Sequence, residues 1–236
     1  MMDMLTQWLG WLPSLAPGLL VSLQLTGLSL LFGFPLGLLF AVMAAAKFAP
    51  LQWISFLFVE VGRGLPALVL LYLLYFSLPD AGITLTSLTT AIIALTWNTG
   101  AYASEYFRAG LAAVPLGQKE AALTSGLRGW TGFRIIILPQ ALRISTPPLA
   151  GLAVLVFQGS ALAFVIAVPE LMSKGFEIAS ITFEYLSVYL LTAVLRVTHS
   201  HFPGSGPGAG TPPRPPPATQ LTFAPPIQGN PAPQPQ

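Results

Sequence analysis

The sequence predicts an all-α integral membrane protein with about five membrane-spanning helices. Of its 236 residues, 54% are hydrophobic and only 8% are charged, whereas soluble domains carry roughly 25% charged residues. Too few charges remain to cover a surface that faces water. In addition, the run from Leu19 to Ala46 holds no charged residue, and about 20 apolar residues are enough for a helix to cross a bilayer.

Composition also excludes several classes of function. The formal net charge of +2 does not indicate a nucleic-acid partner. The chain has no cysteine, which excludes disulfides, thiolate catalysis and cysteine metal sites. Its two histidines, His199 and His201, lie close to the C-terminal end, so imidazole chemistry is not expected in the body of the protein. We therefore expect no catalytic residue and no metal site.

The N-terminal residues 1–17 are expected to form a short helix in the membrane interface. Trp8 and Trp11 support this expectation because indole rings are enriched at membrane surfaces; a frayed terminus is the alternative. In the first span, Gly33 and Gly37 have the spacing that lets another helix approach closely. Pro35 lies between them, so a kink is an equally good explanation of this stretch.

Further apolar segments complete a transmembrane domain over residues 18–195. A proline- and glycine-containing turn at 78–82 separates the second segment from the third. A polar loop at about 115–145 follows the third segment, and a partly amphipathic loop at 169–184 follows the fourth. The expected segments after the first are 52–78, 85–107, 147–168 and 181–195.

The distribution of basic residues predicts the orientation of the chain, because lysine and arginine concentrate in cytoplasmic loops. On one side Lys174 is the only basic residue, and that side also carries several carboxylates. We therefore place the N-terminus outside and the long polar loop in the cytoplasm. The basic residues on the cytoplasmic side are Lys47, Arg63, Arg108, Lys119, Arg128, Arg134 and Arg143.

The polar loop at 115–145 is the part of the chain most available to a partner in water. Glu120, Ala121 and Ala122 are strong helix formers, and the two alanines give a thin helix face that can enter a groove on another protein. Gly126 allows backbone conformations that other residues avoid. The sequence therefore predicts a short helix that ends in a turn.

After this turn, the apolar stretch 135–138 is expected to return to the membrane surface. Pro139 ends or kinks that stretch, because proline lacks a backbone N–H donor. From the residues alone, an alternative remains open in which the loop is a basic interfacial helix that only sets topology.

The loop resembles a known family. The pattern E-A-A-x-x-x-G, followed after nine residues by I-x-L-P, is typical of the cytoplasmic loop in permease subunits of bacterial ABC importers. The resemblance implies a permease fold of the type I importers, in which this loop couples the membrane helices to an ATPase. The matching residues are Glu120, Ala121, Ala122, Gly126, Ile136, Leu138 and Pro139.

Other motifs resemble the polar amino-acid uptake branch of that family, which includes histidine, glutamine, glutamate and arginine permeases. Residues 60–66 read E-V-G-R-G-L-P and are similar to E-x-x-R-G-T-P, with Leu65 in place of threonine. Residues 100–108 read G-A-Y-A-S-E-Y-F-R and resemble G-A-Y-x-x-E-x-x-R. The chain departs from the family at 158–162, Q-G-S-A-L, where a K-(D)-(T/S)-S-L run is usual.

The resemblance implies a division of labour among several proteins. A periplasmic or lipid-anchored binding protein delivers the solute, and a second permease subunit, identical or not, completes the path. A cytoplasmic dimer of ABC ATPases binds ATP. This chain lacks the phosphate-binding pattern G-x-x-x-x-G-K-[ST], so we expect no cofactor in it and no enzymatic activity of its own. The implied location is the lipid of the bacterial cytoplasmic (inner) membrane, crossed several times.

Two pairs of opposite charges lie within the apolar segments. Glu60 and Arg63, and likewise Glu105 and Arg108, are three residues apart, so each pair can meet on one face of a helix. Charges in a bilayer are costly unless they are paired. We therefore expect structural ion pairs, with a cross-pair joining the second and third spans, in preference to solute contacts.

Uncharged polar residues are better candidates for the solute path. Asn98, Gln158 and Ser160 lie in otherwise apolar runs, where an unpaired polar group would be costly. Hydrogen bonding between helices is the alternative role for such residues.

The last part of the chain, residues 196–236, holds 12 of the 23 prolines and predicts a disordered, proline-rich tail. The apolar run before it ends at Leu195 and is about 15 residues long, which is short for a span. We hypothesise that a reading-frame change near Arg196 replaced the natural end of this span. A genuine proline-rich extension is the alternative.

One other class of function is open from the residues alone, namely a stand-alone channel or an ion-coupled secondary transporter. Such a protein would need gating or proton-relay groups inside its spans, and Glu60 and Glu105 are the carboxylates placed to provide them. Co-purification with an ATPase would exclude this alternative.

Overall fold

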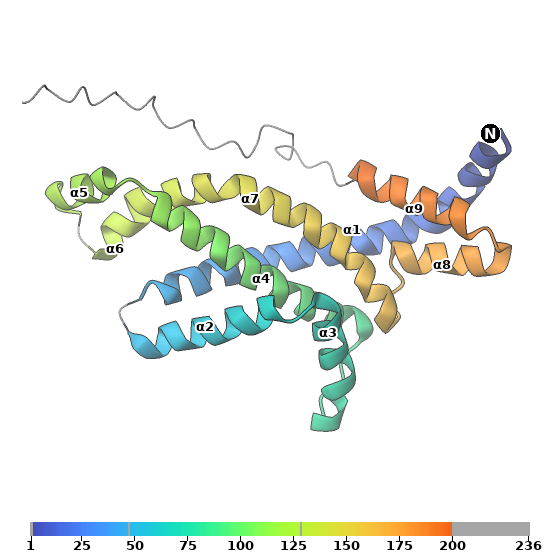
Figure 1. The fold of residues 1–236 in the computed structure, drawn as a ribbon, viewed down its shortest axis with the longest axis horizontal. Helices are drawn as coiled ribbons and strands as arrows, with labels where there is room; N and C mark the ends of the chain where they lie inside the picture. Colours follow the sequence, from blue (N-terminus) through green and yellow to red (C-terminus); the bar gives the residue numbers. More distant parts are fainter. Residues whose placement is uncertain (1, 47, 128, 200–236) are drawn as a thin grey trace, which may run out of the picture.

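A computed structural model describes residues 2–46, 48–127 and 129–199, and within these ranges it contains helices and turns but no strand. The molecule is elongated, with α5 and α6 at one end and the N-terminus, α8 and α9 at the other (Figure 1). The α-helices are α1 (Met2–Ala44), α2 (Ala49–Gly64), α3 (Ala67–Tyr72), α4 (Ser87–Ala113), α5 (Leu116–Thr124), α6 (Gly129–Gly132), α7 (Leu138–Gly159), α8 (Leu171–Thr182) and α9 (Tyr185–His199). The π segments η1 (Leu73–Ser77) and η3 (Phe133–Ile137) and the 3-10 segments η2 (Pro79–Ala81) and η4 (Ser160–Ile166) complete the fold.

Helix α1 is a single helix of 43 residues that packs along α4. The expected boundary between residues 17 and 18 is therefore not a break in the helix. Gly33 and Gly37 form the close approach that their spacing predicts, because a Cβ at Gly33 would lie 2.8 Å from the Cβ of Thr99 and one at Gly37 would lie 2.7 Å from the Cβ of Ala103. The helix continues across Pro35, so the proline does not break it. The short distance between the backbones of α1 and α4 depends on the two glycines, which have no Cβ.

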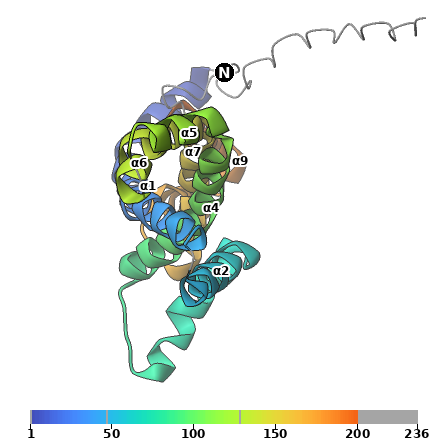
Figure 2. The ribbon, with the colours of Figure 1, turned by 90° about the vertical axis from the view of Figure 1, so that its left-hand side faces the viewer.

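The expected second segment is not one straight span. Helix α2 ends at Gly64 and α3 begins at Ala67, and the helices on either side of this break differ in direction by 106°. Pro66 explains the break, because a proline disfavours the helical conformation of the residue before it, and Leu65 is extended. As a result, α3 and the two segments that follow it project from the bundle (Figures 1 and 2).

Length and hydropathy identify two helices that can cross a membrane, Thr6–Ala44 and Gly129–Ile166, and a third if the bent α2–α3 pair is one span. Helix α4 is long enough to cross a membrane, with 27 residues, but it is more polar than these two helices. It packs at the centre of the bundle, against α1, α2 and α7. Helix α9 has 15 residues. The expected total of five spans stays a prediction.

Two expectations near the C-terminal end were wrong. The segment expected as a loop at 169–184 contains helix α8, which Glu170 caps by accepting a hydrogen bond from the Ser173 N–H at 2.9 Å. Helix α9 also continues past Leu195 to His199, so Arg196 belongs to the folded bundle and not to a tail. The rest of the predicted tail, residues 200–236, lies outside the described residues, and the two explanations of its origin stay hypotheses.

Candidate functional site

The long polar loop forms a compact elbow, which we define as α5, the turn after it, α6 and η3 (residues 116–127 and 129–137). Helix α5 ends in a Schellman arrangement, in which the N–H of Leu127 donates to the carbonyl of Ala122 at 2.9 Å and the N–H of Gly126 donates to that of Leu123 at 3.1 Å. This turn requires a left-handed residue, and Gly126 has a φ of 76°. The glycine of the sequence motif is therefore the residue that ends the helix.

The two alanines of the motif have different environments. Ala121 is exposed, whereas Ala122 is only 3% exposed. Gly132 lies across from Ala122, and a Cβ at Gly132 would come within 2.4 Å of the Leu127 carbonyl. The prediction that both alanines form a face for a partner is therefore wrong for Ala122, because its small side chain lets α6 fold back onto α5.

The exposed face of α5 combines one carboxylate with two leucines. Leu116, Glu120 and Leu123 are spaced at i, i+4 and i+7, so they share a face of the helix. Leu116 is 73% exposed and Leu123 is 56% exposed. These leucines were not among the residues expected to contact a partner, although their helical spacing around Glu120 was a usable signal.

The end of the elbow runs without a break into α7. Pro139 lies in the first turn of that helix, and the π segment η3 precedes it. Ile136 and Leu138 are partly buried here. Pro139 therefore does not end the helical stretch, because proline is tolerated in the first turn of a helix. The Gln140 side chain, one residue on, donates to the Ile136 carbonyl at 3.1 Å.

A second contact ties the elbow to α7. The Gln140 Nε2 also lies 3.2 Å from Oε1 of Gln118 in α5. Movement of α5 would thus act on α7 through both the continuous chain and this side-chain bridge.

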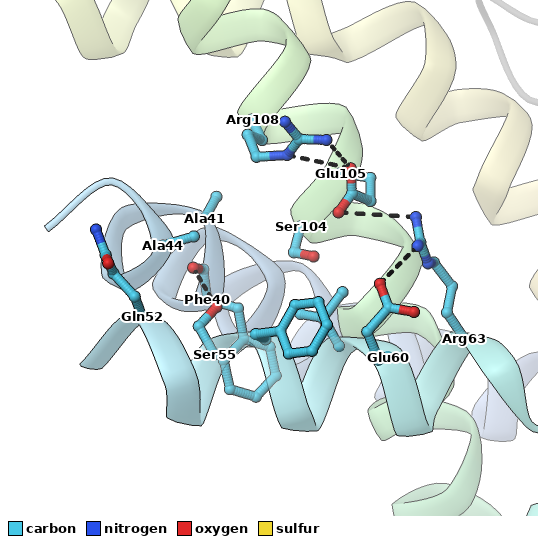
Figure 3. A pocket seen from close by; sticks show the side chains of 12 residues that line it. Phe40, Ala41, Ala44, Gln52, Ser55, Glu60, Arg63, Ser104, Glu105 and Arg108 are labelled. Atoms are coloured by element: carbon cyan, nitrogen blue, oxygen red, sulfur yellow. Dashed lines mark hydrogen bonds and ion pairs between the residues drawn. The ribbon is translucent and has the colours of Figure 1, made fainter. Parts of the chain in front are cut away.

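Glu60 and Arg63 of α2 and Glu105 and Arg108 of α4 form a ladder of charges between the two helices (Figure 3). Arg63 lies 2.9 Å from Glu60 on its own helix and 3.7 Å from Glu105 on α4, and the Nε of Arg108 donates to Glu105 at 3.1 Å. Both expected pairs and the expected cross-pair are present. The ladder borders a cavity of about 470 Å³ that Phe40, Ser55 and Ser104 also line.

Asn98 contacts both the bend of α2 and a second cavity. Its Nδ2 donates to the Gly62 carbonyl at 2.8 Å, next to the break between α2 and α3. It also lines a cavity of about 280 Å³ between α4 and α7, which we call the Asn98 cavity; Leu155 and Gly159 form part of its α7 wall. Within the described part of the chain, the Asn98 Oδ1 accepts no hydrogen bond, so this oxygen is available to a solute.

The other two candidates for the solute path lie elsewhere. Ser160 is fully buried, and its hydroxyl donates to the Phe157 carbonyl at 2.7 Å. Gln158 is exposed and does not line the Asn98 cavity. The structure therefore does not bring the three polar residues together at one site.

A buried ion pair, which the sequence analysis did not predict, joins α8 and α9. Glu170 is 0% exposed, and its Oε2 lies 2.6 Å from Arg196 and 3.1 Å from the Ser22 hydroxyl. Arg196 also donates to the Phe157 carbonyl at 2.8 Å and lies 3.3 Å from the Ser160 hydroxyl. We call these five residues the Glu170 cluster. Burial raises the pKa of the Glu170 carboxyl, against the opposing effects of backbone hydrogen bonds and the Arg196 charge.

The comparison with known families decides what kind of protein this is. Residues 33–198 match the family described as "Binding-protein-dependent transport system inner membrane component". The chain belongs to this family. It is thus an integral membrane subunit of an ABC importer that forms part of a translocation path, and a separate subunit carries the ATPase activity.

Individual relatives cover most of the chain. It is 37% identical over 183 residues to "Probable amino-acid ABC transporter permease protein YckA" of Bacillus subtilis (strain 168), which is 78% of this chain and 81% of that protein. It is 37% identical over 181 residues to "L-cystine transport system permease protein TcyB" of the same organism, 77% of each chain. A solved structure, "Crystal structure of an amino acid ABC transporter with histidines", has a TM-score of 0.78 at 31% identity and covers 83% of this chain and 91% of its own.

Proposed function

We propose that this permease subunit carries a polar amino acid or a similar small solute across the bacterial cytoplasmic membrane, and that its elbow is the contact with the ATPase. The exposed face of α5 is the observation that supports the contact. A short helix that presents Leu116, Glu120 and Leu123 fits the mode in which an amphipathic helix enters a groove of another protein. Polar amino acids are favoured as solutes because both bacterial relatives and the solved structure are described as amino-acid or cystine transporters.

The same geometry suggests how ATP binding reaches the membrane helices. The elbow continues directly into α7. The side chain of Gln140, in α7, also contacts Gln118 in α5 and the Ile136 carbonyl in η3. When two ATPases close on ATP, each would move one elbow, and the rigid connection would shift α7 relative to α4. Such a contact couples two states of the motor to two states of the path.

Crosslinking from the elbow tests the contact. The chain has no native cysteine, so a single cysteine can be placed at Leu123 in a complex with the partner ABC ATPase. We expect a bifunctional thiol reagent to capture the ATPase from this position. Ile181→Cys serves as the control, because Ile181 is even more exposed than Leu123, 74% against 56%, but lies in α8 at the opposite end of the molecule. Equal capture from both positions, or capture from neither, would reject the elbow as the contact.

We further propose that the Asn98 cavity contacts the solute through the free Oδ1 of Asn98. The variant Asn98→Leu should raise the solute concentration for half-maximal uptake in liposomes that contain the complete importer, tested with radiolabelled glutamine, histidine, arginine and cystine. Trp97→Phe is the matched control, because the Trp97 indole also holds α2, through the Phe58 carbonyl at 2.9 Å, but does not line the cavity. An equal effect of both substitutions would assign the role to the bend of α2 and not to the solute.

The remaining partners follow from the family. A binding protein, periplasmic or lipid-anchored, would deliver the solute, and a second permease subunit, identical or related, would complete the path. Co-purification of this chain with the products of neighbouring genes would identify both. The ion-coupled alternative is disfavoured, because Glu60 and Glu105 are each paired with an arginine and so are poorly placed to relay protons.

A further inference from the structure

Both oxygens of the Glu170 carboxylate accept hydrogen bonds, and no part of the side chain is exposed. Its Oε1 accepts from the Ser173 N–H at 2.9 Å, and its Oε2 accepts from Ser22 and Arg196. A buried carboxylate needs a positive partner, and Arg196 provides it. This contact joins α9 to the first turn of α8 and to the middle of α1.

Arg196 uses its second terminal nitrogen for a different purpose. This nitrogen donates to the carbonyl of Phe157 at 2.8 Å and lies 3.3 Å from the Ser160 hydroxyl. The guanidinium carbon also lies 5.6 Å from the centre of the Phe157 ring. These atoms belong to the point where α7 ends and the 3-10 segment η4 begins, and the Phe157 carbonyl accepts from the Ser160 hydroxyl as well as from Arg196.

The end of α7 held in this way is also a wall of the Asn98 cavity. Leu155, Val156 and Gly159 line that cavity, and Phe157 lies among them in the sequence. We propose that Arg196 is a positioning residue, which fixes the end of α7 against the fully buried Glu170 and thereby sets the rim of the Asn98 cavity. The consequence for transport rests on the proposed role of that cavity in solute contact.

The geometry requires an arginine and not merely a positive charge. A guanidinium is planar and presents separate nitrogens to the carboxylate and to the carbonyl, whereas the ammonium of a lysine is a compact point charge. Arg196→Lys should therefore keep the ion pair with Glu170 and lose the contact with Phe157. The double variant Glu170→Gln, Arg196→Met removes both charges and the Phe157 contact together, without leaving a buried charge unpaired.

Two measurements on the full chain in the reconstituted importer test the proposal. We expect Arg196→Lys and the double variant to assemble in normal amounts and to raise the amino-acid concentration for half-maximal uptake about ten-fold. Glutamine, histidine, arginine and cystine are the probes. If both assembled variants keep the parent's half-maximal concentration, Arg196 serves only as the counter-charge of Glu170 and the proposal is rejected.

The second measurement does not depend on transport. A cysteine at Leu155, in the wall of the cavity, should react with a small charged thiol reagent at a rate that Arg196→Lys changes about ten-fold. A cysteine at Gln52, which lies in the other cavity, should react at the same rate in both backgrounds. Altered reactivity at Leu155 alone supports the positioning role even if the parent transports none of the four amino acids, an outcome that would count only against the proposed solute. Unaltered reactivity at Leu155, or equal changes at both positions, would overturn it.

Discussion

The elbow lies at the opposite end of the molecule from α8 and α9 (Figure 1), the two helices that the Glu170–Arg196 pair joins. The elbow and the Glu170 cluster treat their charged groups differently. In the elbow, Glu120 is exposed, and the buried positions are held by small residues such as Ala122 and Gly132. In the Glu170 cluster the charges are inside, with Glu170 fully buried and the Arg196 side chain 14% exposed. The elbow thus presents its polar group to a partner, whereas the cluster uses its polar groups to join four parts of its own chain.

This difference separates coupling from stability. Substitutions on the exposed face of the elbow should leave the fold intact and weaken contact with the motor, because exposed side chains contribute little to the free energy of unfolding. Substitutions that leave one charge of the cluster unpaired should destabilise the subunit before any transport step is reached.

The largest effect is expected for Arg196→Met. Removal of one partner from a buried ion pair costs about 3–5 kcal/mol, so the melting temperature of the detergent-solubilised subunit should fall sharply at neutral pH. Burial raises the pKa of Glu170, so the folded state binds the proton more tightly than the unfolded state does, and stability falls as pH rises through the raised pKa. The loss should accordingly shrink when the pH is lowered.

The double variant Glu170→Gln, Arg196→Met is the control for that experiment. Without any buried charge it should keep most of the parent's melting temperature and show no such dependence on pH. An Arg196→Met subunit as stable as the parent would mean that the pair is not buried in the assembled protein.

The two alanines of the elbow provide the second test. Ala122→Arg places a long charged side chain where α6 packs against α5, and overpacking costs about 1–3 kcal/mol. It should expose the elbow to limited proteolysis and abolish solute-stimulated ATP hydrolysis. Ala121→Arg, on the exposed side, should leave the proteolysis pattern unchanged and reduce only the affinity for the ATPase. Identical proteolysis of the two variants would contradict the inward position of Ala122.

Much of this contrast follows from how far apart in the sequence the interacting residues are. The elbow was predictable because its helix and its turn are encoded within a few residues, with helix formers at Glu120 and Ala121 and a glycine at 126. The ladder was predictable for the same reason, since Glu60 and Arg63 are neighbours on one helix. The long apolar runs likewise indicated α1 and α7, and the resemblance supplied the family.

What could not be predicted depends on contacts between distant segments. Nothing local shows that Arg196, next to a proline-rich stretch, meets a carboxylate 26 residues earlier. The inward side of Ala122 depends on how α6 folds back, and Ser160 was assigned to the path because its bonding to Phe157 and Arg196 was not visible. The bend of the second segment is an intermediate case, because Gly64 and Pro66 marked the place but not its effect on a long apolar run.

A smaller effect is expected for Gly126→Ala. The left-handed conformation at this position costs a non-glycine residue about 1–2 kcal/mol, although open space surrounds the missing Cβ. Gly117→Ala is the matched control in the same helix, because Gly117 also has open space and its φ is not positive, so alanine should favour the helix there. Hydrogen exchange of the elbow amides should therefore increase in the first variant and decrease in the second. Changes of the same sign in both would mean that the turn at Gly126 is not formed.

The smallest effect is expected for Glu60→Gln in the ladder, and it tests whether burial or the number of ion pairs sets the contrast. The ladder has more ion pairs than the Glu170 cluster, but the Glu60 and Arg63 side chains are 46% and 34% exposed, and exposed pairs contribute about 0–1 kcal/mol. Arg63 also keeps its contact with Glu105 when Glu60 is neutral. The melting temperature should therefore change by a small fraction of the change caused by Arg196→Met, measured in the same detergent at neutral pH. A loss comparable to that of Arg196→Met would show that lipid or a second subunit covers the ladder in the assembled importer, and the ladder would then belong with the Glu170 cluster and not with the exposed elbow.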